Sequence, residues 1–250
     1  MKKKLFLIAA TFMLMFSFAG QAMASFAAGD LIQVVLTNDG SGSEVVTDLG
    51  SFTSNTTSGS ITDTTLSNTV DFTTNFSGQS LSNLNVVYFV ADGSNTGIWV
   101  TGNDGGQSNS SGKKSGTNSA LTNLLNYYAS LGSGSQVVGA SSDTNSYWSL
   151  MDKGGVGVGT FDGFIHLTAD ADSSLAALAT TGYVDQYLYY YAASTLNSAK
   201  SGVEIADIRT FADGHTEIIP LVSTPLPAAV WLLGSGLMCL VGIRRRETAV

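Results

Sequence analysis

The chain alternates between short apolar runs and clusters of glycine, serine, asparagine and aspartate. The runs at residues 31–36, 85–90 and 97–100 are rich in β-branched and aromatic side chains and end at turn-forming residues. Runs of this length and composition are typical of β-strands. The same pattern predicts further strands at residues 69–76, 136–139, 146–151, 159–168, 202–208 and 216–221. We therefore predict an all-β or mainly β fold of the β-sandwich type, with one or two short helices, as a single domain over residues 25–223.

One segment has the periodicity of an amphipathic helix. Apolar side chains recur at spacings of three and four residues at Leu121, Leu124, Leu125, Tyr128 and Leu131. Asn118 or Ser119 is suited to cap the start of this helix, and Gly132 is suited to end it. We expect the helix to cover one face or one end of the sheet.

Three tyrosines, Tyr187, Tyr189 and Tyr191, alternate along another segment, which places them on one face of a predicted strand. Packing against neighbouring strands is the favoured interpretation. The alternative is an exposed aromatic platform that stacks on sugar rings. A helix over residues 176–193 is also compatible with the pattern, because apolar side chains recur there every four residues.

Residues 103–117 contain no apolar side chain, which predicts a surface loop carrying Lys113 and Lys114. This loop does not match a phosphate-binding loop, because five residues separate Gly106 from Gly112 where four are required. A second glycine-rich segment, residues 154–159, predicts a turn or a bulge rather than a dinucleotide-binding loop.

The first 24 residues have the layout of a secretory signal peptide. Lys2, Lys3 and Lys4 precede an apolar stretch at residues 5–19. Ala22 and Ala24 then provide the pattern of small residues that signal peptidase accepts, so we predict cleavage after Ala24.

Residues 228–243 form a second apolar run, which is followed by Arg244, Arg245 and Arg246. A helix of these residues rises about 24 Å, so Pro225 or Leu226 has to contribute to cross a hydrocarbon core of about 30 Å. Three arginines at the far end place that end in the cytoplasm and the rest of the chain outside. We therefore predict one transmembrane helix near the C-terminus.

The order of parts in this tail carries a resemblance. Thr224, Pro225, Leu226, Pro227 and Ala228 lead into the apolar run, and the arginine cluster closes it. This segment resembles the PEP-CTERM class of sorting signals, in its VPLPA-type variant, with Thr224 where the variant has valine. The resemblance covers residues 224–250 and implies recognition and cleavage near this motif by a membrane-embedded exosortase. It also implies a Gram-negative host that makes exopolysaccharide. It implies nothing about residues 25–223.

The charge of the chain is uneven. Six of its eleven bases lie at the two ends, so residues 25–223 hold five bases and eighteen acids, a net charge of −13. Affinity for duplex nucleic acid comes mainly from lysine and arginine on phosphates. An acidic body of this kind argues against a nucleic-acid partner.

The sequence offers few residues for metal or redox chemistry. Cys239 is its single cysteine, and His166 and His215 are its two histidines. This excludes a disulfide within the chain, a thiolate metal cluster and a histidine-rich metal site. We therefore expect no cofactor and no catalytic activity.

Asp170 and Asp172 resemble the start of a calcium-binding loop. Leu175 occupies the position of the expected glycine, and Thr181 occupies that of the final acid. Calcium is compatible with so acidic a body outside the cell, but this spacing assigns no ligands.

His215 and Glu217 are two residues apart and share a face of a predicted strand. They are interpreted either as a base with its orienting acid or, preferably, as an exposed pair after the turn at Asp213 and Gly214.

These observations predict an exported protein that signal peptidase and an exosortase-like enzyme process, with the inner membrane as its anchor before processing. We expect a structural or adhesive role at the cell surface, in the outer envelope or in an extracellular exopolysaccharide matrix. The first alternative is a carbohydrate-binding module that uses exposed tyrosines, Trp99 or Trp148. The second is a secreted hydrolase with two acids about 5 to 10 Å apart.

Overall fold

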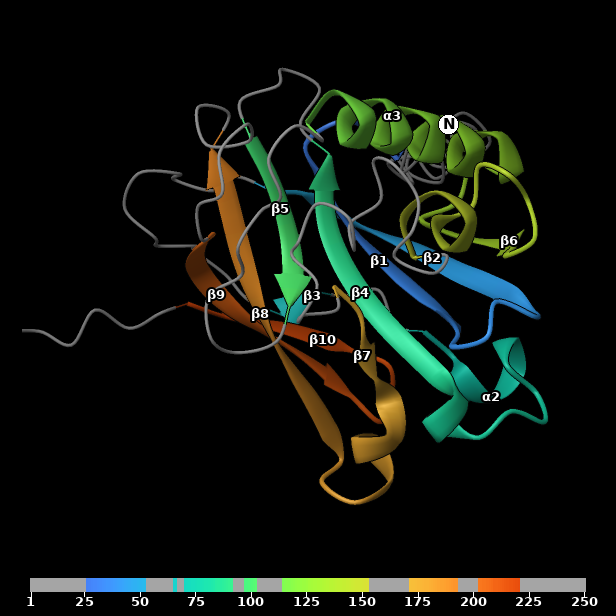
Figure 1. Ribbon diagram of the computed structural model, residues 1–250. Helices are drawn as coiled ribbons and strands as arrows, with labels where there is room; N and C mark the ends of the chain where they lie inside the picture. Colours follow the sequence, from blue (N-terminus) through green and yellow to red (C-terminus); the bar gives the residue numbers. More distant parts are fainter. Residues whose placement is uncertain are drawn as a thin grey trace, which may run out of the picture. The chain divides into compact units, whose positions relative to one another are not determined.

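The computed structural model describes residues 26–52, 65–66, 70–91, 97–102, 114–152, 171–192 and 202–220 (Figure 1). Within these residues the strands form one antiparallel sheet in the order β3-β10-β9-β8-β5-β4-β1-β2-β6, and β7 pairs with β4 beside this path. The strands are β1 (Asp30–Thr37), β2 (Ser43–Ser51), β3 (Thr65–Leu66), β4 (Leu84–Ala91), β5 (Gly97–Gly102), β6 (Gln136–Ala140), β7 (Ser173–Ser174), β8 (Tyr183–Ala192), β9 (Val203–Phe211) and β10 (Thr216–Pro220). The helical segments are α2 (Phe72–Asn75), η1 (Leu81–Asn83), α3 (Lys114–Leu131), η2 (Trp148–Asp152) and η4 (Leu175–Ala179). The mainly β prediction is confirmed.

The sheet curls until its two halves face each other. Gln33 on β1 and Thr216 on β10 are separated by four strands in the sheet, yet Gln33 Nε2 donates to Thr216 Oγ1 over 3.2 Å. Likewise, the Tyr88 hydroxyl on β4 lies 2.6 Å from Thr210 Oγ1 on β9. Side chains this far apart in a flat sheet do not meet, so the sheet has the form of a half-barrel.

This shape corrects the expected β-sandwich. The described strands belong to one curled sheet rather than to two sheets packed face to face. Strands in both architectures alternate side chains between two faces, so the sequence pattern is the same for each. The strand order and the contacts across the curl distinguish them.

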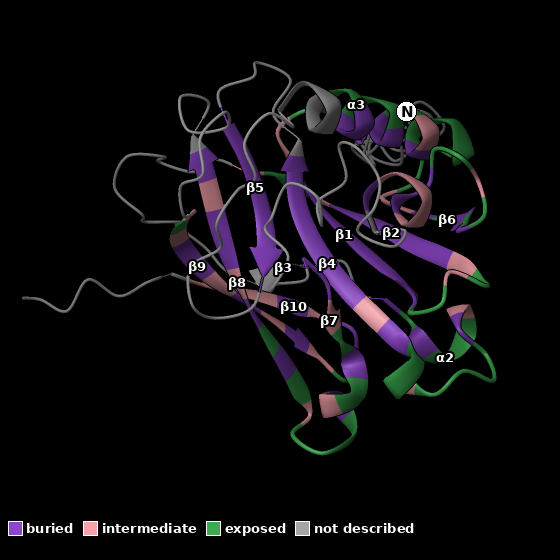
Figure 2. Cartoon of the chain, in the orientation of Figure 1, coloured by how far each residue is buried: buried purple, intermediate pink, exposed green. Residues whose placement is uncertain are grey.

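Both faces of the middle strands of the sheet are buried. On β1, Leu31 and Val35 point into the curl, whereas Ile32, Val34 and Leu36 point to the opposite face, where α3 lies. Figure 2 shows buried residues along the middle strands and exposed residues mainly in the turns and helices, including the outer side of α3. A strand covered on both sides has no solvent-facing side, which explains why residues 31–36 of β1 are apolar on both faces except at Gln33, which is buried inside the curl.

Helix α3 confirms the periodicity prediction. Leu121, Leu124, Leu125 and Tyr128 are buried against the sheet, whereas Leu131 is 39% exposed. The helix ends at Leu131, directly before the predicted terminator Gly132. It begins at Lys114, so residues 114–117, which we expected in a loop, belong to the helix instead.

Two predicted strands are helical turns instead. In residues 69–76, the Asp71 carboxylate accepts hydrogen bonds from the N–H groups of Thr73 and Thr74 and so starts α2. In residues 146–151, the chain forms the turn η2. In the first run, the hydrogen bonds to Asp71 outweigh the apolar character of the residues. In the second run, Leu150 N donates to Ser146 O over 3.0 Å, which closes the turn.

Several predicted segments lie outside the described residues. They are the signal peptide at residues 1–24, the sorting signal at residues 224–250, the glycine-rich segment at residues 154–159 and the strand at residues 159–168. Residues 103–113 of the predicted loop 103–117 also lie outside. In the part of the chain that the structure describes, no helix has the length and apolar character needed to cross a membrane.

Candidate functional site

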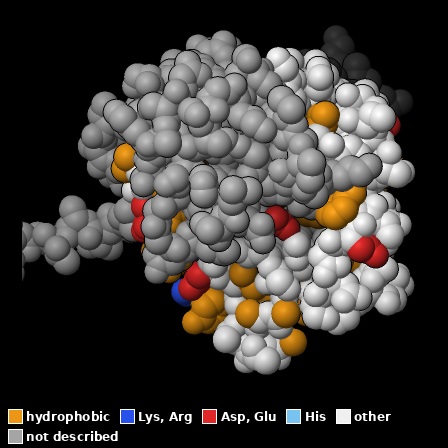
Figure 3. Space-filling model, in the orientation of Figure 1, with side chains coloured by type: hydrophobic (Ala, Val, Ile, Leu, Met, Phe, Trp, Pro, Cys, Tyr) orange, Lys and Arg blue, Asp and Glu red, His pale blue; other side chains and the backbone are white. Residues whose placement is uncertain are grey.

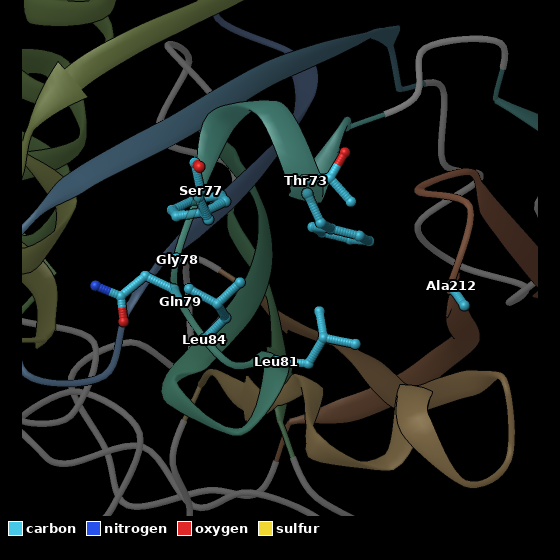
Figure 4. A pocket seen from close by; sticks show the side chains of 9 residues that line it. Thr73, Ser77, Gly78, Gln79, Leu81, Leu84 and Ala212 are labelled. Atoms are coloured by element: carbon cyan, nitrogen blue, oxygen red, sulfur yellow. The ribbon is translucent and has the colours of Figure 1, made fainter.

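A pocket of about 290 Å³ opens between α2, η1 and the turn that joins β9 to β10 (Figure 4). In Figure 4, Thr73 and Ser77 stand on the α2 turn, Leu81 lies beneath it, and Ala212 faces it from the other side. The lining residues are Phe72, Thr73, Phe76, Ser77, Gly78, Gln79, Leu81, Leu84 and Ala212. The pocket is therefore built mostly from one local stretch of chain and closed by a second, distant one.

The α2 side of the pocket is fixed by its cap. Asp71 Oδ1 accepts from Thr73 N and Thr74 N, each at 3.0 Å, and from Thr73 Oγ1 at 2.7 Å. Thr74 Oγ1 donates to the other carboxylate oxygen at 2.7 Å. These bonds, of which that from the Thr74 hydroxyl has the largest effect, lower the pKa of Asp71 to about 2. The turn thus forms around an ionised carboxylate, with Phe72 and Phe76 on its buried side.

On the opposite side of the pocket, the conformation of Gly214 holds the β9–β10 turn in place. Val70 N donates to Gly214 O over 3.1 Å, and Gly214 N donates to Phe211 O over 2.9 Å. Gly214 has a φ of +86°, and a Cβ there would lie 2.0 Å from Val70 O. Only glycine fits this position, which brings Ala212 to the edge of the pocket.

The lining of the pocket contains no charged residue. Phe72, Phe76, Leu81 and Leu84 supply apolar surface, and Thr73, Ser77 and Gln79 supply hydroxyl and amide groups. Such a lining is suited to binding and does not supply an acid and a base for catalysis.

His215 and Glu217 each lie beside a residue other than the predicted partner. His215 Nδ1 lies 2.5 Å from Asp213 Oδ1, and its ring stacks on Phe211 with centroids 4.0 Å apart. The hydrogen bonds from His215 lower the pKa of Asp213. Glu217 instead lies opposite Arg209 in the register of β9 and β10. The turn at Asp213 and Gly214 is confirmed.

The neighbouring pair of strands carries an ion pair that the sequence did not reveal. Arg209 Nε and one terminal nitrogen donate to the two carboxylate oxygens of Asp185 at 2.6 and 2.8 Å. The Arg209 guanidinium also lies 4.0 Å from the ring centroid of Tyr183. The hydrogen bonds with Asp185 raise the pKa of Arg209. The cross-strand register that joins these residues is not readable from spacing along the chain.

A second missed residue is Glu44, which is 0% exposed under α3. Its carboxylate accepts from the Tyr128 hydroxyl and Tyr147 N, each at 3.0 Å, and from Trp148 N at 3.3 Å. Burial raises the pKa of Glu44 to about 7, and these hydrogen bonds oppose the rise. The residue joins β2, α3 and η2, and the sequence signal was an acid next to the apolar pair Val45 and Val46.

The three tyrosines lie on one face of a strand, as predicted, but they do not form the alternative, an exposed platform for a ligand. Tyr187, Tyr189 and Tyr191 lie on β8, which confirms the strand interpretation over the helix. Tyr189 and Tyr191 are each 1% exposed, and Tyr187 packs against the same core. A residual exposure of 1% leaves Tyr189 and Tyr191 no ring face on which a sugar can stack.

The two tryptophans proposed for the same role also pack within the fold. Trp99 is 5% exposed, and its ring centroid lies 4.8 Å from that of Tyr190. Trp148 is half-buried and lies beneath Gly40, where an added Cβ would lie 2.1 Å from its ring. Neither residue forms part of an exposed aromatic row.

The acid pair considered for calcium is divided. Asp170 lies outside the described residues, whereas Asp172 is buried and accepts a hydrogen bond from the Asn85 amide. Leu175, at the position of the expected glycine, is an apolar core residue. Across the described ranges, no group of three or more histidine, cysteine, aspartate or glutamate side chains is placed to hold a metal ion.

The predicted sorting residues Pro225, Leu226, Pro227 and Ala228, the cluster Arg244, Arg245 and Arg246, and the signal-peptidase site at Ala22 and Ala24 all lie outside the described residues. Comparison with models of protein families, with curated proteins and with solved structures finds no match to this chain.

Proposed function

We propose that this chain is an exported protein whose folded part acts at the cell surface or in an exopolysaccharide matrix, in a structural or adhesive role. In this proposal, signal peptidase cuts after Ala24 and an exosortase-like membrane enzyme processes the tail. The order of the tail supports it, since a Pro-Leu-Pro motif, an uncharged apolar run and three arginines follow one another without interruption.

The sorting motif follows the last described strand closely along the chain. Strand β10 ends at Pro220, and the motif begins at Pro225. Four residues, 221–224, separate the last described strand from the motif. A cut near Pro225 would then remove none of the described strands.

The surface of the described part is compatible with a matrix environment. In Figure 3, the described atoms on this face are mostly uncharged polar side chains and backbone, with scattered acidic groups and with several apolar groups gathered at the lower edge. Two acids of this part serve the fold: Glu44 accepts a hydrogen bond from Tyr128 of α3, and Asp71 caps the start of α2. This use of acids supports a binding or structural role over a catalytic one.

The arginine cluster provides the test of sorting. We expect the triple variant Arg244→Ala, Arg245→Ala and Arg246→Ala to lose retention in the inner membrane and processing, because the positive charges that stop translocation are removed. The matched control is the triple arginine-to-lysine variant, which keeps the charge. Fractionation of the host into inner membrane, outer envelope and medium gives the measurement. Unchanged localisation of the alanine variant would contradict the sorting proposal.

A further inference from the structure

The pocket between α2, η1 and the β9–β10 turn has a fixed apolar floor. Phe72 and Phe76 are buried and belong to the core cluster inside the curl, and the partly buried Leu81 packs against that cluster. Side chains held by a core do not have to be ordered when a ligand arrives, so the pocket is formed in advance. A floor of this kind fits the apolar C–H face of a ring.

The rim of the pocket supplies uncharged hydrogen-bonding groups. Ser77 and Gln79 are exposed, and neither side chain forms a hydrogen bond with another of the described residues. A hydroxyl donates and accepts, and a primary amide has both a donor and an acceptor end. Groups of this type match ligand hydroxyls, which also donate and accept.

Charge narrows the class of ligand. The nine lining residues are uncharged, so an ionic ligand finds no partner within the pocket. The nearby Asp71 carboxylate is occupied by the backbone and hydroxyl groups of Thr73 and Thr74, and Asp213 is bonded to His215. A body with a net charge of −13 also disfavours an anionic ligand.

The volume of the pocket limits the size of the ligand. The pocket volume of about 290 Å³ lies near the lower end of the range for small-molecule sites, which begins at about 300 Å³. A pocket of this volume takes one ring with its substituents rather than a chain of several.

We propose that this pocket binds a single ring of a neutral sugar, with the C–H face on the floor formed by Phe72, Phe76 and Leu81 and the hydroxyls at Ser77 and Gln79. A ligand of about a dozen heavy atoms binds such a site with a Kd of about a millimolar. The inference goes beyond sorting and does not depend on it, since the binding measurement is the same whether or not the tail is processed.

The test is saturation-transfer difference NMR on the full-length chain in a sugar-free detergent. The probes are methyl glucoside and methyl galactoside, with the methyl glycoside of glucuronic acid and with cyclohexanol as comparisons. We expect signal transfer from the protein to the C–H protons of one ring face for at least one neutral glycoside, at about millimolar concentrations.

Two variants locate the site. Ala212→Trp places a large side chain at the exposed edge of the pocket and should weaken binding about tenfold or more. Ala140→Trp, an exposed position on β6, is the matched control and should leave binding unchanged. Circular dichroism and the unfolding midpoint check that both variants fold.

Four results would overturn the proposal. They are no transfer to either neutral glycoside at about 100 mM, which is far above the expected Kd, equal or stronger binding of the glucuronide, binding of cyclohexanol alone, and binding that Ala212→Trp does not change. Binding of a neutral glycoside that Ala212→Trp abolishes and Ala140→Trp preserves would support it.

Discussion

The Tyr88 hydroxyl on β4 lies 2.9 Å from the Thr216 hydroxyl on β10, although three strands separate β4 from β10 in the sheet. Gln33 and Thr210 meet the same hydroxyl at 2.7 and 2.6 Å, and all four residues are buried. The curl of the sheet is thus held by a buried polar group as well as by apolar packing.

Removal of this hydroxyl should destabilise the fold. We expect Tyr88→Phe to lower the free energy of unfolding by about 1–3 kcal/mol, because Gln33, Thr210 and Thr216, which are all buried, lose a hydrogen-bond partner. Tyr183→Phe, which changes a partly exposed tyrosine, should alter it by less than about 0.5 kcal/mol. Urea unfolding followed by circular dichroism measures both. Equal effects of the two substitutions would show that the buried network contributes nothing.

Glu44 should make stability depend on pH. Its pKa rises from 4.5 to about 7 on folding, so its contribution to stability is complete below about pH 4.5 and declines as pH rises through 7. The full decline corresponds to about 3 kcal/mol at most. We expect Glu44→Gln to remove this decline, as measured by urea unfolding at a series of pH values between 5 and 8.

Tyr128→Phe provides the companion to this measurement. It removes the hydroxyl that donates to the Glu44 carboxylate and lowers its pKa. The decline in stability should therefore extend to higher pH than in the native chain. A native chain whose stability is constant from pH 5 to 8 would contradict both expectations.

Gly214 should be far less tolerant of substitution than Gly182. Both have positive φ, +86° and +80°, but a Cβ at Gly182 meets nothing within 4 Å, whereas one at Gly214 would meet Val70 O at 2.0 Å. Gly182→Ala should cost about 1–2 kcal/mol from backbone strain. Gly214→Ala should cost at least about 1 kcal/mol more, because the β9–β10 turn has to move away from Val70. Thermal unfolding compares them, and similar costs would mean that the turn shifts freely.

Much of the sheet was predictable from local pattern. The apolar runs at residues 31–36, 85–90, 97–100, 136–139 and 202–208 are confirmed as strands, because alternation and turn residues are local properties. Strand β2 was missed because Glu44 and Asp48, which are both buried, interrupt its apolar pattern. The curl of the sheet depends on contacts such as that between Gln33 and Thr216, which no local pattern encodes.

The candidate pocket was beyond the reach of sequence reasoning. Its two sides, around Phe72 and at Ala212, are far apart along the chain, and the bond from Val70 to Gly214 helps to bring them together. The apolar run at residues 69–76 predicted a strand, and the cap at Asp71 made it a helical turn. The regular spacing of the tyrosine row is compatible with a platform for a ligand, and that same spacing places Tyr189 and Tyr191 in the core.

Mass spectrometry of both ends of the protein, recovered from the envelope and medium of its native host, is the most direct test of export and processing. We predict a chain that begins at Ser25 and ends between Pro225 and Ala228. A chain that retains Val250 and remains in the inner membrane would contradict this prediction.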